Sequence, residues 1–182
     1  LSQIGYIVIG LSLGTSAGIL ASFIHIANHS IMKAGLFMGA GSIYSMTNSR
    51  VTLKNMQGLG QSMPITSVGI TILLLSLLGI PLTVGFISKI YLLKAVFNHG
   101  NWPIVFAIVL TSFMALGYVW KIIENLWMKE PIKKNVFFIE KPSLYIPILL
   151  LAALNILFGI YSYPIVDGAL SASQSIFWSN LS

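Results

Sequence analysis

Two histidines and a lysine at four-residue spacing are the first residues in this chain that could do chemistry. His25, His29 and Lys33 lie within an otherwise apolar stretch. Steps of four residues turn only ~40° around an α-helix, so the three side chains would project from one face over ~12 Å. Imidazole changes charge near neutral pH, and a lysine deprived of water releases its proton more readily. The spacing therefore predicts a path for protons.

Two other interpretations of these residues compete with the proton path. The histidines could satisfy neighbouring hydrogen bonds while Lys33 extends its stem to the interface, but Lys33 lies far from either end of the stretch. A two-histidine metal site is the other, and no nearby carboxylate completes it. Ionisable residues at membrane depth are costly and usually face a bundle interior or a wet cavity. This cost favours the proton path, and we expect no metal.

Lys89 is the second candidate site for proton transfer. It follows a run that contains Gly79, Pro81 and Gly85. Glycine and proline next to a buried charge suggest a broken helix, in which freed backbone groups and water can solvate an ion. The alternative is an ordinary kinked helix from which Lys89 reaches the interface. We favour the broken helix.

The remaining charges near the apolar segments have structural explanations. Lys94 lies close to a polar connector at 99–101 and is expected to anchor the helix at the interface. Lys121 and Glu124 are three residues apart near a helix end, where they should pair on the helix surface. Asp167 is expected to be solvated.

The composition requires a membrane environment. Of the 182 residues, 56% are hydrophobic and only 8% are charged, whereas soluble domains carry roughly 25% charged residues. Most of the outer surface must therefore face lipid. The net charge of +6 does not indicate nucleic-acid binding, because the basic residues gather in loops between apolar segments.

Several classes of chemistry find no support in the chain. There is no cysteine, which excludes disulfides, thiolate metal sites and iron–sulfur clusters. Phosphate-binding glycine loops, nucleophile elbows and metalloprotease motifs are also missing from the sequence. We therefore expect a transporter rather than an enzyme, with no cofactor.

The elements that must position these residues are long apolar segments. One helix over 65–97 would be ~50 Å long, beyond the ~30 Å hydrocarbon core, so it must break at Gly79–Pro81. The pattern predicts an all-α fold, a polytopic transmembrane bundle with a broken helix. We expect a partial N-terminal span at 1–13 and about five full spans, at 17–46, 65–80, 82–97, 102–127 and 143–163.

Basic residues predict the orientation. Arg50 and Lys54 lie in a first basic loop, 47–63, and four lysines (129, 133, 134 and 141) lie in a second basic loop, Met128–Pro142. Counting three spans between them places the two loops on opposite faces, and the larger number of lysines predicts that the second is cytoplasmic. The chain begins without Met inside an apolar stretch, so we expect a piece of something longer or the product of a split gene.

Three motifs carry a resemblance to a known family. In His25–Phe37, Gly58–Pro64 and Gly79–Lys89, the chain resembles the proton-translocating antiporter-like subunits shared by respiratory complex I and the multisubunit (Mrp-type) Na⁺/H⁺ antiporters. The match runs from residue 1 to about 128. It implies that 1–163 is the second inverted repeat with the helices after it, and that 164–182 is a short interfacial tail.

The resemblance also implies roles for the candidate residues. Lys89 matches the lysine of the family's second broken helix, taken as the terminal proton donor of a half-channel. His25, His29 and Lys33 match the hydrated polar line that feeds it. The first repeat of the family is missing from this sequence, so another subunit would have to supply it.

The function expected from the resemblance is that of a membrane subunit of a multisubunit monovalent cation/proton antiporter. Gly85–Leu92 resembles the D-type subunit of such Na⁺/H⁺ antiporters, in a bacterial inner membrane, with the lipid bilayer, other subunits, protons and Na⁺ as partners. The alternative is a proton-pumping membrane subunit of NADH-quinone oxidoreductase, without a redox centre in this chain. A further alternative is an inactive fragment of such a subunit.

Overall fold

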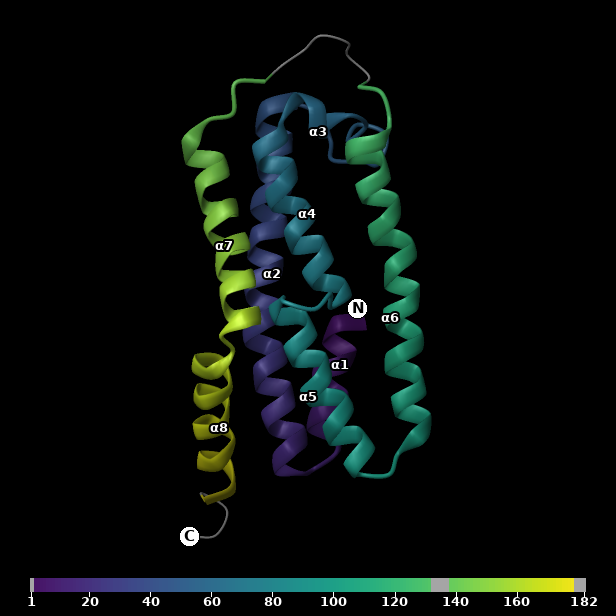
Figure 1. Cartoon of the computed structure of the whole chain (residues 1–182), viewed down its shortest axis with the longest axis vertical. Coiled ribbons are helices and arrows are strands. Elements are labelled where there is room, and N and C mark those ends of the chain that lie inside the picture. The colour runs from purple at the N-terminus through teal and green to yellow at the C-terminus, as the bar shows by residue number, and fades with distance from the viewer. Residues whose placement is uncertain (1, 132–137, 179–182) are drawn as a thin grey trace.

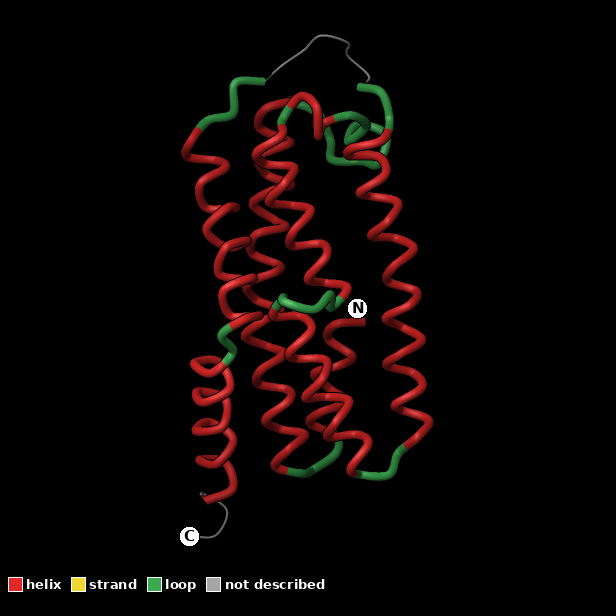
Figure 2. Tube along the Cα trace, viewed as in Figure 1, coloured by secondary structure: helices red, strands yellow, loops and turns green. Residues whose placement is uncertain are grey.

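The protein is a bundle of helices of unequal length (Figure 1). The computed structural model describes residues 2–131 and 138–178, and within these ranges it contains helices and loops but no strand (Figure 2). The all-α prediction is thus confirmed for the described residues. The helices are α1 (Ser2–Ser12), α2 (Ser16–Thr47), α3 (Leu59–Ser62), α4 (Pro64–Leu78), α5 (Val84–Asn98), α6 (Trp102–Ile123), α7 (Pro142–Ile160) and α8 (Tyr163–Trp178), and a π-helical turn (Glu124–Met128) extends α6.

The long helix α2 forms the centre of the bundle. Gly14, with φ +62°, turns the chain after α1, and the Thr15 side chain accepts a hydrogen bond from the Gly18 N–H to cap the new helix. With 32 residues, α2 is ~48 Å long and contacts α1, α4, α5, α7 and α8. A Cβ at Gly18 would collide with the Gly10 carbonyl, so α1 and α2 cross in direct contact. The polar residues of α2 therefore face several helices at once.

The expected helix break separates α4 from α5. Gly79 ends α4 in the left-handed conformation (φ +83°), and the chain stays non-helical until Thr83 (Figure 2). A Cβ at Gly85 would collide with the Ser76 carbonyl, so only glycine lets the start of α5 approach the end of α4 this closely. The prediction of a broken helix around Gly79–Pro81 is confirmed.

The two halves α4 and α5 lie end to end and together run the length of the bundle beside α6 (Figure 1). The first and second basic loops consequently meet at the same end. The Gly58 N–H donates to the Asn125 carbonyl at 2.9 Å, and the Phe138 N–H donates to the Ser62 carbonyl at 3.1 Å.

The expectation that the basic loops lie on opposite faces is therefore wrong. It counted 65–80 and 82–97 as two separate spans, whereas the halves of one broken helix make a single passage between the ends of the bundle. Arg50, Lys54, Lys129 and Lys141 all belong to one end. Lys133 and Lys134 lie outside the described residues.

The outer surface of the bundle is apolar. Phe106, Phe113 and Met114 on α6 are each about 70% exposed. Two helices are long and apolar enough to cross a membrane by length and composition, Trp102–Met128 and Pro142–Ile160. By length and composition, the expected count of about five full spans is not confirmed. The helices α4 and α5 have only 15 residues each, and α2 carries polar residues.

The last helix continues from α7. The chain leaves its helical path only at Tyr161 and Ser162, and α8 then runs along the other half of α2 (Figure 1). The residues expected as a tail thus contain a helix up to Trp178. Their assignment to the membrane interface stays a prediction.

Candidate functional site

Lys89 binds the end of the helix that precedes its own. Its side chain is 7% exposed, and Nζ donates to the carbonyl oxygens of Leu78 (2.7 Å) and Leu77 (3.4 Å). The last carbonyls of an α-helix have no partner within the helix and form the negative end of its dipole. The break therefore creates the acceptors that a buried ammonium needs.

The third acceptor of Lys89 comes from α6. Ser112 Oγ lies 3.3 Å from Lys89 Nζ, so each of the three N–H bonds of the ammonium has an oxygen within reach. These three acceptors carry partial charges only. Among the described residues, Lys89 is therefore bound by carbonyl and hydroxyl oxygens and by no carboxylate.

Tyr6 connects this site to α1. Its hydroxyl lies 3.3 Å from Ser112 Oγ and 2.8 Å from Thr111 Oγ1, and the centre of its ring lies 5.7 Å from Lys89 Nζ. The same ring packs edge-on against His25 at 5.6 Å. Sequence reasoning missed Tyr6 and Ser112, because a tyrosine and a serine in apolar helices carry no periodic or charge signal.

His25 approaches Lys89 from α2. It is 1% exposed, and its Nδ1 lies 3.0 Å from the hydroxyl of Ser88, the residue before Lys89. One turn further along α2, Asn28 Nδ2 donates to the Val84 carbonyl at 2.8 Å. Both contacts fix α2 against the first turns of α5, so His25 and the broken helix lie side by side.

His25, His29 and Lys33 form a ladder along α2, and its second and third members lie closer to the surface than its first. The rings of His25 and His29 are stacked, with their centres 6.0 Å apart and their planes at 7°. His29 is half-buried, while Lys33 is exposed on this chain and its Nζ lies 5.3 Å from the centre of the Phe37 ring. The three residues thus run in order from the interior to the surface of the described chain. Their role in proton transfer stays a prediction.

Several buried polar atoms near this site have no protein partner among the described residues. They are Gln3 Oε1, His25 Nε2, Asn28 Oδ1 and His29 Nδ1. Buried polar groups are nearly always hydrogen-bonded, and ordered water is the usual partner where protein supplies none. Unpartnered polar atoms therefore occur at several points between His29 and the helix break.

A cavity of about 340 Å³ lies beside Lys89. Its walls are mostly apolar, and Lys89 and Ser112 form its polar part; Leu78, Phe86, Ile108 and Phe113 contribute apolar walls. Because the walls on this side are apolar, the hydrogen bonds of the amine come from α4 and from Ser112 on α6.

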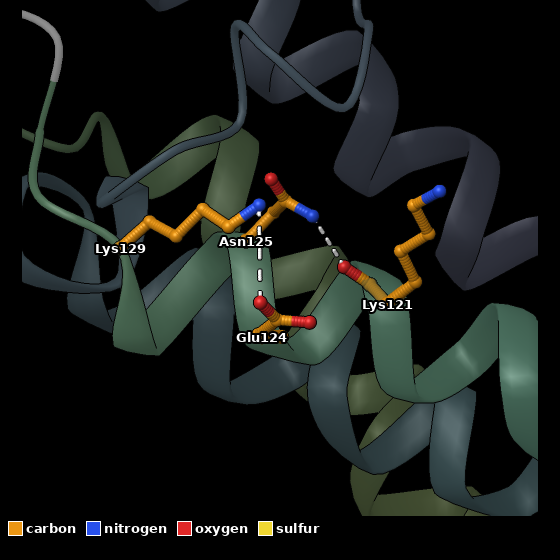
Figure 3. A network of polar contacts seen from close by, with 4 residues as sticks. All are labelled: Lys121, Glu124, Asn125 and Lys129. Atoms are coloured by element: carbon orange, nitrogen blue, oxygen red, sulfur yellow. Dashed lines mark hydrogen bonds and ion pairs between the residues drawn. The ribbon is translucent and has the colours of Figure 1, made fainter.

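The charged cluster at the end of α6 has a structural role (Figure 3). The predicted pair of Lys121 and Glu124 is wrong: Glu124 Oε1 lies 3.8 Å from Lys129 Nζ, and the Lys121 ammonium points away. The Asn125 side chain donates to the Lys121 carbonyl at 2.6 Å, and the Lys129 N–H reaches the Glu124 carbonyl at 3.3 Å across a π-turn. This wider turn brings Glu124 toward Lys129, and both side chains are about 40% exposed, so the pair adds little stability.

Comparison with known proteins places this geometry in a family context. The family model described as NADH:quinone oxidoreductase/Mrp antiporter, TM, matches residues 1–115, a range that contains Tyr6, His25, Lys89 and Ser112. NADH-quinone oxidoreductase subunit N of Desulforudis audaxviator is 30% identical, with 93% of this chain and 36% of that protein covered. The D-type subunit of the Na⁺/H⁺ antiporter from Alkalihalophilus pseudofirmus is 33% identical, and the match covers 97% of this chain and 36% of that protein.

A solved structure extends the comparison to three dimensions. A chain of the membrane-bound sulfane sulfur reductase, an archaeal respiratory membrane complex, superposes with a TM-score of 0.86 at 32% identity, covering 96% of this chain and 35% of that one. The chain spans about a third of the length of these relatives.

Proposed function

This chain belongs to the NADH:quinone oxidoreductase/Mrp antiporter transmembrane family, and we propose that it acts as a membrane subunit of a multisubunit monovalent cation/proton antiporter. The observation that carries the proposal is the environment of Lys89. A buried amine at a helix break, bound to carbonyl and hydroxyl oxygens, can gain and lose a proton without breaking an ion pair.

In this proposal, Lys89 exchanges protons with two polar branches. One branch passes Ser88 and His25 to His29 and Lys33; the other passes Ser112 to Tyr6. Water at the unpartnered atoms of His25 and His29 would complete the first branch. Protonated Lys89 is stabilised by the end of α4, and the neutral amine can accept the next proton.

The proposed arrangement in the membrane follows from the end-to-end helices. We take α2, α4 with α5, α6, and α7 with α8 each as one crossing, and α1 as a partial one. Both basic loops then lie on one face, which the positive-inside rule assigns to the cytoplasm. The bacterial inner membrane is the proposed location.

The partners are proposed from the length of the relatives. Because this chain spans about a third of them, another polypeptide or segment would supply the family's first repeat. The exposed Lys33, at membrane depth on α2, marks the face that such a partner would cover. The transported ions would be protons and Na⁺.

A second function is favoured by one observation. The relative named NADH-quinone oxidoreductase subunit N matches 93% of this chain, nearly as much as the 97% matched by the antiporter subunit. A proton-pumping membrane subunit of a quinone oxidoreductase would use the same Lys89 site.

The experiment is to purify the complex that contains this chain and reconstitute it in sealed vesicles. Proton movement driven by a Na⁺ gradient supports the antiporter, whereas proton movement driven only by a quinone and its electron donor supports the oxidoreductase. A complex that moves protons under neither condition would contradict both proposals. It would favour the remaining interpretation, that the chain is an inactive fragment of such a subunit.

A further inference from the structure

We infer that α7 and α2 hold a buried water at the helix break, between the side chains of Asn155 and Asn28. Asn155 is 0% exposed, and neither its amide nitrogen nor its oxygen has a hydrogen-bond partner among the described residues. Buried polar groups are nearly always hydrogen-bonded, so an amide with both ends unpaired calls for a bound group.

The packing of α7 places Asn155 one helical turn from the break. A Cβ at Gly159 would collide with the Leu82 carbonyl, and Gly159 follows Asn155 by one helical turn, about 6 Å along the axis. In the other direction, a Cβ at Gly35 would lie 3.4 Å from Leu151 Cβ, one turn before Asn155. Asn155 therefore lies between these two contacts, on the same face of α7.

Asn28 lies on the Gly35 side of α2, nearer the break than Asn155. The two helices run in opposite directions (Figure 1), so the turn from Leu151 to Asn155 corresponds to the turn from Gly35 to Ile31, and Asn28 lies three residues, ~4.5 Å, further along α2. A water bonded to both side chains at ordinary hydrogen-bond lengths spans ~5–6 Å and can bridge this offset. Asn28 Nδ2 already donates to the Val84 carbonyl at the start of α5, while its Oδ1 has no partner among the described residues. The oxygen of Asn28 is thus an available acceptor at the level of the break.

The Ser76 hydroxyl near the end of α4 already has partners. Ser76 Oγ donates to Met32 Sδ at 3.2 Å and accepts from the Gly85 N–H at 3.3 Å. The unmet groups are one acceptor on Asn28 and one donor and one acceptor on Asn155. Water both donates and accepts, so one molecule can satisfy both side chains, whereas a cation would leave Asn155 Nδ2 unpaired.

The position gives this water a use that rests on the proposed function. Asn28 lies one turn from His25, and Val84 lies one turn before Ser88, which binds His25. The water would hydrate the break from the side opposite the cavity beside Lys89. It would also make α7, which lies beyond the matched range 1–115, part of the polar interior.

The test is a cryo-EM map of the assembled complex in which ordered waters are visible elsewhere in the protein core. A water density within ~2.7–3.2 Å of both Asn28 Oδ1 and an Asn155 amide atom is expected. A map that shows other core waters but a dry Asn155 overturns the inference. This readout does not depend on transport, so it separates the water site from the proposed function.

The role of the water is tested with Asn155→Leu, which keeps the branched shape of the side chain and removes its hydrogen bonds. We expect loss of the density and a several-fold fall in proton flux, with Leu157→Ala on the exposed face of α7 as the control. Unchanged flux in assembled Asn155→Leu overturns the role in proton delivery. If Asn155→Leu fails to assemble, Asn155→Ser replaces it, because serine leaves a hydroxyl and room for a second water. We expect Asn155→Ser to retain proton flux. Loss of flux in the assembled Asn155→Ser complex would overturn the role of the water in proton delivery.

Discussion

The ammonium of Lys89 lies 2.7 Å from the carbonyl oxygen of Leu78, the last residue of the preceding helix. The helix that carries the charge and the helix that stabilises it are therefore two halves of one broken element. The break frees the carbonyls, the carbonyls stabilise the ammonium, and the ammonium satisfies groups that would otherwise be unpaired.

Replacing Lys89 tests the proton site directly. Lys89→Ala should reduce proton-coupled flux of the reconstituted complex to background, because no other amine of the described residues binds the end of α4, while assembly is retained. Lys94→Ala, on an exposed position of the same helix, should transport normally. Flux at the wild-type level in Lys89→Ala would remove this residue from the mechanism.

The histidine branch predicts slower proton delivery. His29→Ala removes the ring stacked on His25 and should lower flux several-fold and change its dependence on pH. The exposed His99 gives a matched control, since His99→Ala removes an imidazole far from the site. A pH profile identical to that of the wild type would make the ladder structural.

The close approach of Gly85 to the Ser76 carbonyl predicts that a larger residue at position 85 lowers the stability of the protein. In Gly85→Ala the added Cβ meets the Ser76 carbonyl, and we expect a loss of about 1–3 kcal/mol and a lower Tm. Gly117→Ala on α6 is the comparison, because nothing lies within 4 Å of its Cβ position; this change should be neutral or stabilising by up to ~1 kcal/mol. Equal Tm values for the two variants would contradict the tight contact.

Because both basic loops lie at one end of the bundle, cysteines placed in them should be accessible from the same side of the membrane. The chain has no cysteine, so single cysteines give a clean background. Asn55→Cys and Lys129→Cys should react with an impermeant thiol reagent from the same side of the membrane, and His99→Cys from the other side. Labelling of the first two from opposite sides would refute the single broken crossing.

Glu140 in the second basic loop caps α4 from a distance. Its two carboxylate oxygens accept from the N–H groups of Ile65 (2.9 Å) and Thr66 (2.8 Å), at the positive end of the helix. Glu140→Ala should therefore lower stability by about 1 kcal/mol. Glu140→Gln, which keeps one acceptor, should lose less; thermal unfolding of both variants in detergent decides the order.

The sequence was informative where a single residue type dictates the backbone or is rare in an apolar segment. Gly79 with Pro81 predicted the break, and the ladder predicted which face of α2 turns inward at His25. Charge near a helix end was less informative: Lys121 and Glu124 have suitable spacing, but the Asn125 side chain competes for a backbone carbonyl and the wider turn redirects Glu124 to Lys129.

The parts that sequence reasoning missed depend on tertiary contacts. Tyr6, Ser112 and Asn155 are unremarkable polar residues in separate helices, and only the packing brings them to the break. The orientation error had a different cause. Hydropathy shows where a helix is interrupted, but it does not show whether the chain turns back or continues in the same direction.

Lys89 and its hydrogen-bond acceptors belong to different helices, and this has a mechanical consequence. Lys89, the proton carrier of the proposed function, belongs to α5, whereas two of its acceptors belong to α4 and one to α6. A small slide or tilt of α5 against α4 and α6 would change all three hydrogen bonds at once. In the proposed function, the interruption would therefore act as a joint at which the displacement of a helix and the protonation of Lys89 are linked.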